Sequence, residues 1–200
     1  MTLALGYKGL PVEIKLVDPA DRAAVVETSG QELVPVLVDD GTVVFDSRVI
    51  LEHLEQRHPD PPLWPEDPAR RAEVDVFVDW FDRVWKRPPN EIVVEMKAHE
   101  PDEARIERWG TVMRDSLDRF ERLLHGRDFL FGGEITAADF IAFPFLQYAR
   151  GIDEDDRQLF HRVLERWLRS REHPRLAEWI ERIDARPRAG DRAVHELPAG

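Results

Sequence analysis

Prolines crowd one short stretch of this chain, and that stretch constrains the fold more than any other feature. Five prolines fall within residues 59–68. Because proline has no backbone N–H and a fixed φ, such a stretch can be neither a helix interior nor a central strand. We therefore expect a linker over residues 59–68 between a first domain, residues 1–58, and a second domain, residues 69–200. A chain of 200 residues has room for two small domains.

The first domain combines strand and helix patterns. Val12–Val17 alternates apolar and charged side chains, which predicts a half-buried strand. Val34–Val38 and Thr42–Phe45 flank an Asp-Asp-Gly turn and predict an antiparallel hairpin. Between these strands Pro19–Gly30 suits a short helix, and a helical spacing of apolar residues begins at Ser47. The predicted order is strand, helix, hairpin and helix.

The second domain is predicted to be helical throughout. Apolar residues recur at helical spacing in five segments, with a break at Pro88-Pro89: residues 69–87, 101–125, 136–150, 154–171 and 174–186. Thr136 and Asp139 have the spacing of a capping box, in which each side chain bonds a backbone N–H of the other residue. We expect this pair to stabilise the start of its helix and to have no catalytic role.

The first of these helices carries more apolar surface than one neighbour can cover. Its main stripe consists of Val74, Phe77, Val78, Phe81 and Trp85. Val76, Trp80 and Val84 widen this stripe to an arc of roughly 200°. The excess predicts a subunit interface or an apolar ligand pocket. Equally, a helix inside a bundle could simply be covered on two sides.

Charge and composition exclude several classes of function. A net charge of −12 argues against nucleic acid or an anionic membrane as the main partner, because both require a basic surface. Without cysteine the chain has no disulfide, no cysteine metal ligand and no cysteine nucleophile. No apolar run reaches membrane-spanning length, and residues 1–5 do not form a signal peptide. We expect a cytoplasmic protein that binds no metal.

The order of these elements resembles the glutathione transferases. Four segments and the ending around the last predicted helix carry the resemblance, together covering most of the chain: residues 3–13, 34–41, 46–54, 129–139 and 173–187. The resemblance implies an α/β thioredoxin-like domain, shortened at its start, followed by an all-helical bundle domain. It also implies glutathione as co-substrate and a homodimer.

Four residues match the glutathione-binding positions of that family. In the family the bond before the proline corresponding to Pro35 is cis, and the backbone of the residue at Val34 holds the cysteinyl part of glutathione. Ser47 begins a helix, whose free N–H groups suit a carboxylate. Asp46 can accept a hydrogen bond from an ammonium group. There are alternative interpretations of both positions. Pro35 could be an ordinary proline at the start of a strand, and Ser47 could only cap its helix.

The part of the family's sequence that activates the thiol has no counterpart in this chain. Family members carry a Tyr, Ser or Cys on a loop after their first strand, and Met1 here corresponds to a position inside the following helix. We therefore assign no catalytic residue and expect the natural protein to start upstream. Tyr7 lies too close to Pro11, at the far end of that helix, and is interpreted as packing. Leu33 replaces a polar residue that contacts the glycine end of glutathione in many relatives.

The missing strand would lie between Val12–Val17 and Val34–Val38. Without it these strands would be roughly 10 Å apart, twice the normal spacing. About ten backbone groups would lose partners, at something like 1–3 kcal/mol each if buried. We expect that such a gapped sheet is not stable, and that the two strands would otherwise close up directly.

Two classes of function follow from the resemblance. The first is an enzyme whose full-length form conjugates or reduces small electrophiles with glutathione, with Trp80, Trp85 and Arg87 lining the acceptor pocket. The second is a non-catalytic binding or dimerisation module with the same fold. A fragment of an inactive enzyme, without a stable fold, is a third interpretation.

Overall fold

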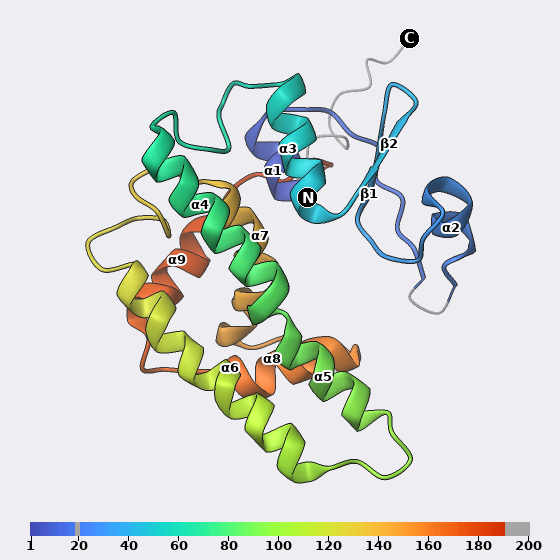
Figure 1. The fold of residues 1–200 in the computed structure, drawn as a ribbon, viewed down its shortest axis with the longest axis vertical. Helices are drawn as coiled ribbons and strands as arrows, with labels where there is room; N and C mark the ends of the chain where they lie inside the picture. Colours follow the sequence, from blue (N-terminus) through green and yellow to red (C-terminus); the bar gives the residue numbers. More distant parts are fainter. Residues whose placement is uncertain (19–20, 191–200) are drawn as a thin grey trace. The chain divides into compact units, whose positions relative to one another are not determined.

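The computed structural model describes residues 1–18 and 21–190, which form two compact units (Figure 1). Of the described residues, the first unit contains Met1–Trp64 together with residues 186–190, and the second unit contains Pro65–Ala185. The chain thus leaves the first unit, builds the second and then returns.

The first unit contains three short helices and a hairpin. Its elements are α1 (Thr2–Tyr7), α2 (Ala23–Ser29), β1 (Val36–Asp39), β2 (Thr42–Phe45) and α3 (Ser47–Arg57). The strands are antiparallel, with Asp39 opposite Thr42. The turn residues Asp40 and Gly41 both have positive φ, as a type I′ turn requires. The predicted hairpin and the helix at Ser47 are confirmed.

The strand predicted over Val12–Val17 is wrong. This segment forms neither strand nor helix, and two of its apolar side chains are exposed, Leu16 by 94% and Ile14 by 44%. The sheet of the described residues has only the two strands β1 and β2. The two predicted neighbours, residues 12–17 and 34–38, therefore do not close up into a directly paired sheet. An alternating pattern forms a strand only where a partner strand satisfies its backbone.

A buried ion pair holds the proline-dense segment against the helices of the first unit. Lys8, the residue after α1, has a fully buried side chain whose Nζ lies 3.1 Å from a carboxylate oxygen of Glu55 on α3. The same Nζ donates to the carbonyls of His58 and Pro61. Glu55 also accepts from the amide N–H of Leu63. These bonds join α1, α3 and the proline-dense segment.

Residues 186–190 pack on α1 within the first unit. The Ala189 amide donates to the Thr2 carbonyl at 2.9 Å, and the Arg186 guanidinium lies over the Tyr7 ring. The approach is close at Gly6, where an added Cβ would lie 2.3 Å from the Pro187 carbonyl oxygen. No side chain larger than hydrogen fits at this position unless the returning segment moves.

The second unit is helical. Its elements are α4 (Pro68–Trp80), a π-helical turn η1 (Phe81–Trp85), α5 (Arg87–Met96), α6 (Glu103–Leu123), α7 (Ala137–Leu146), a 3₁₀ turn η2 (Gln147–Arg150), α8 (Leu159–Leu168) and α9 (Pro174–Asp184). No helix of the described residues is long and apolar enough to span a membrane.

The break predicted at Pro88-Pro89 is wrong. Both prolines lie in the first turn of α5, where a helix needs no N–H donor. The π-helical turn Phe81–Trp85 joins α4 to α5, and the two helices follow one another along one line (Figure 1). The prolines begin a helix that the sequence pattern did not reveal.

The predicted capping box at Thr136 and Asp139 is present at the start of α7. The Asp139 carboxylate is completely buried and accepts from the N–H of Leu130, the N–H and hydroxyl of Thr136, and Nε1 of Trp179. Burial raises the pKa of Asp139, and these hydrogen bonds act in the opposite direction. Asp139 therefore links the loop before α7 to both α7 and α9.

Candidate functional site

The peptide bond between Val34 and Pro35 is cis, as the resemblance implies. It lies directly before β1, where Val34 is 50% exposed. Among the described residues, neither the N–H nor the C=O of Val34 has a hydrogen-bond partner. These two groups are therefore available to pair with an extended peptide-like ligand, in the manner of an added strand.

Asp46, and not Ser47, caps α3. The Asp46 side chain accepts from the backbone N–H of Arg48 at 2.9 Å and of Val49 at 3.3 Å. Ser47 is the first helical residue. The interpretation of Ser47 as a plain cap is therefore wrong. With two first-turn donors already paired, the hydroxyl and N–H of Ser47 itself remain for an incoming carboxylate.

Hairpin register brings the predicted residues together. Val36 on β1 lies opposite Phe45 on β2. Pro35 directly precedes the first of these residues and Asp46 directly follows the second, so the cis bond and the start of α3 lie at the same end of the hairpin. A peptide-like group at Val34 and a carboxylate at Ser47 could thus belong to one small ligand.

Two further residues of the first unit behave as the sequence interpretation implies. Tyr7 ends α1 and its hydroxyl lies 3.5 Å from the Pro62 carbonyl, so it acts in packing. Leu33 is 77% exposed and offers no polar side-chain atom. The neighbouring Gln31 bonds the backbone of Leu33 and its amide is used there.

An ion pair that sequence analysis missed fixes α3 against the hairpin. Nε2 of His53 lies 2.7 Å from Oδ2 of Asp39, and Nε of Arg57 lies 3.5 Å from the same oxygen. The hydrogen bond with His53 is the main reason that the pKa of Asp39 is lowered. Only the folded hairpin brings these residues together, so no local pattern indicates them.

The three residues predicted to line an acceptor pocket, Trp80, Trp85 and Arg87, lie in different surroundings in the second unit. Trp85 is 4% exposed, stacks on Phe81 and donates to Ser116, so its predicted place in an open pocket is wrong. Arg87 lies over the Trp109 ring. Trp80 is half-buried on α4.

Much of the predicted excess apolar surface on this helix is exposed. Val76 is exposed by 70% and Val84 by 55%. The main stripe around Phe77 is buried, as predicted. The explanation that the helix is covered on two sides by its own bundle is therefore wrong, and an interface or a ligand surface remains.

Family models match both units. The model of the glutathione S-transferase N-terminal domain matches residues 1–62, and that of the glutathione S-transferase C-terminal domain matches residues 103–182. The chain belongs to the glutathione S-transferase family. Its fold is that of the family, with a thioredoxin-like first unit that has a small sheet and a helical second unit.

Individual relatives agree with this membership. FtsZ-localized protein A of Caulobacter vibrioides is 33% identical over 154 residues, which span 70% of this chain and 67% of that protein. A probable maleylacetoacetate isomerase of Caenorhabditis elegans is 41% identical over 73 residues, which span 35% of this chain and only 34% of the isomerase.

Solved glutathione S-transferases share the fold over most of the chain. The structure from Methylobacterium radiotolerans, a complex with glutathione sulfonate, is 28% identical with a TM-score of 0.72 and covers 93% of this chain and 84% of its own. The structure from Rhodospirillum rubrum is 27% identical with a TM-score of 0.69. This match covers 93% of this chain and 82% of the Rhodospirillum rubrum chain.

Proposed function

We propose that the first unit binds glutathione at the end of the hairpin, in a glutathione-transferase-like function. In this proposal the backbone of Val34, held by Pro35, pairs with the cysteinyl part of the ligand. The hydroxyl and N–H of Ser47 receive the γ-glutamyl carboxylate, and Asp46 accepts from the ammonium group. The observation that carries the proposal is the register of the hairpin, which puts these groups at one end.

The proposed reaction is conjugation or reduction of a small electrophile with glutathione in the cytoplasm, where glutathione is kept reduced. Such a reaction requires a hydrogen-bond donor at the sulfur, which lowers the pKa of the thiol. Tyr7 does not supply it, because its hydroxyl lies against the Pro62 carbonyl. A standard conjugation assay on the 200-residue chain, with glutathione and a small electrophile, measures whether this reaction occurs.

A non-catalytic binding module is the second candidate function. One relative, 33% identical, is named for its localisation with FtsZ and not for a reaction. Binding of glutathione without turnover of any electrophile would support this second candidate. Turnover with a supplied thiol and a small electrophile would support the first.

Removing the Ser47 hydroxyl should weaken glutathione binding. We expect Ser47→Ala to lower the affinity about tenfold, because a hydrogen bond to a charged carboxylate is lost. Asp46→Asn should also weaken it, through loss of the negative charge, while asparagine still caps α3 and tolerates the positive φ of this position. Isothermal titration calorimetry with reduced glutathione measures both changes in affinity.

The matched control is Thr28→Ala, which removes an exposed hydroxyl of α2 in the same unit. It should bind glutathione as the native chain does. If Ser47→Ala and Asp46→Asn bind as tightly as this control, or if the native chain shows no binding, the proposed site is wrong.

The proposal includes a homodimer that covers the exposed apolar side chains of α4 and η1. Sedimentation velocity should show a dimer at micromolar concentration. Replacing both Val76 and Val84 by lysine should produce monomers, since two charges would then be buried in the interface. Val94→Lys, at a valine of α5 that is 67% exposed, is the control and should leave the dimer intact. A native monomer would contradict the proposal.

A further inference from the structure

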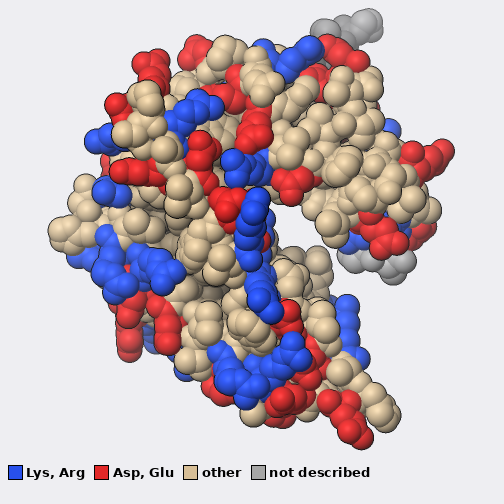
Figure 2. All heavy atoms as spheres, in the orientation of Figure 1, with Lys and Arg blue, Asp and Glu red and all other residues tan. Residues whose placement is uncertain are grey.

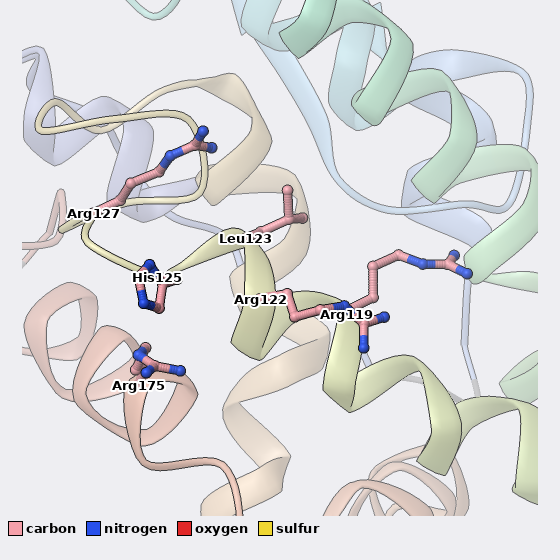
Figure 3. A pocket seen from close by; sticks show the side chains of 6 residues that line it. All are labelled: Arg119, Arg122, Leu123, His125, Arg127 and Arg175. Carbon is pink, nitrogen blue, oxygen red and sulfur yellow. The ribbon is translucent and has the colours of Figure 1, made fainter.

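Basic side chains gather in clusters on the surface of this acidic protein (Figure 2), and one cluster lines a pocket of about 540 Å³ in the second unit. The residues that line this arginine pocket are Arg119, Arg122, Leu123, His125, Arg127 and Arg175 (Figure 3). They come from the end of α6, the loop that follows and the first turn of α9. The volume is typical of sites for small molecules.

Three of the four arginines have no acidic partner in the part of the chain that the structure describes. Among the described residues, no carboxylate pairs with Arg119, Arg122 or Arg127. The Arg119 guanidinium lies over the Trp80 ring, and Arg127 donates to the Leu130 carbonyl. Only the fourth, Arg175, forms an ion pair. The pocket therefore holds several positive charges without internal compensation.

The acidic residues around the pocket are already engaged. Glu121 pairs with Arg175 at 3.2 Å and accepts from the N–H groups of Arg175 and Leu176 at the start of α9. Asp118 lies 3.0 Å from Nε2 of His173. Asp128 lies 3.8 Å from Arg182. Each of these carboxylates thus has a basic partner, and only Glu121 engages an arginine of the pocket.

The dipole of α6 accounts for only part of the cluster. Basic side chains near a helix C-terminus interact favourably with its partial negative charge, which explains Arg119 and Arg122. Arg127 and Arg175 belong to other segments, and Arg175 is neutralised by Glu121. The approach of Arg127 to the same pocket brings further positive charge next to Arg119 and Arg122, which repels unless an anion is bound.

We propose that the arginine pocket is a second binding site, for a small anion that carries two or more phosphate groups. A planar guanidinium group offers paired N–H donors that match phosphate oxygens. The three arginines without a carboxylate partner, two on α6 and one on the loop after it, offer more donors than one carboxylate can accept. All residues of the pocket lie in the second unit, so this site does not depend on the proposed glutathione site.

Inorganic pyrophosphate is the probe that tests the site. Isothermal titration of the native chain at low ionic strength should show saturable binding that weakens as salt is added. Arg122→Gln should weaken the binding about tenfold or more, because a charge-assisted contact is lost. The control is Arg108→Gln, which removes an exposed arginine of the same helix outside the pocket and should not change the affinity.

Tryptophan emission gives a second measurement. Since the Arg119 guanidinium lies over Trp80, pyrophosphate should change the emission of the native chain. In Trp80→Phe the change should be lost while the heat of binding persists. This result would locate the anion at the arginine pocket.

Three results would overturn the proposal. They are the absence of saturable pyrophosphate binding, an affinity in Arg122→Gln equal to that of Arg108→Gln, and binding only to vesicles that contain phosphatidic acid. The third result would show that the arginines bind a lipid headgroup and not a soluble anion.

Discussion

Replacement of Lys8 by methionine is expected to lower the free energy of unfolding by about 3–5 kcal/mol, the cost of breaking a buried ion pair from one side. The Lys8 side chain is fully buried, and its Nζ bonds Glu55 and two carbonyls of the proline-dense segment. Methionine fills similar space but leaves the carboxylate and both carbonyls without this donor. Urea unfolding followed by circular dichroism measures the change.

The control for this experiment is Lys15→Met. Lys15 belongs to the same unit, its side chain is 83% exposed and its ion pair with Glu13 is long. Its loss should change stability by less than about 0.5 kcal/mol. The double variant Lys8→Met with Glu55→Gln should recover part of the loss, because the unpaired buried charge is gone. A loss in Lys8→Met no larger than in Lys15→Met would contradict the structural role of the pair.

Replacement of Asp139 by alanine should have an effect of similar size in the second unit, about 3–5 kcal/mol. The carboxylate receives four donors from the loop before α7, the capping residue Thr136 and α9. Alanine would leave these buried donors unpaired and a cavity beside them. Thermal unfolding followed by near-ultraviolet circular dichroism would report the loss of tertiary packing.

A graded comparison separates this effect from loss of a single bond. Trp179→Phe removes one donor, the indole N–H, together with part of a buried ring, and should still cost less than Asp139→Ala, which leaves four buried donors unpaired. Asp115→Ala removes an exposed carboxylate from α6 and should have little effect. Equal losses in Asp139→Ala and Trp179→Phe would show that the backbone bonds to Asp139 contribute nothing.

Local chemistry explains which elements could be predicted from the sequence. The Asp-Gly turn and the capping box each depend on residues within a few positions, so the hairpin and the start of α7 were predicted correctly. The prolines at the start of α5 were interpreted as a break, because a proline that begins a helix and one that ends a helix look alike without the next turn.

Tertiary contacts explain what could not be predicted. Lys8 meets Glu55 only after two helices pack, and nothing near either residue in the sequence indicates the other. The segment Val12–Val17 has the pattern of a strand but no partner strand among the described residues. At the candidate site the four residues were predicted, whereas the capping role of Asp46 depends on a positive φ that only the backbone reveals.

Return of the chain to the first unit has a consequence for biosynthesis. The surface of α1 around Gly6 is covered by residues 186–190, which leave the ribosome only after all of the second unit. During translation this surface is therefore exposed to water and to other chains until residues 186–190 have been synthesised. Most of the first unit is translated before the second unit, but the hydrogen bond between Ala189 and Thr2 that completes it is among the last contacts to form.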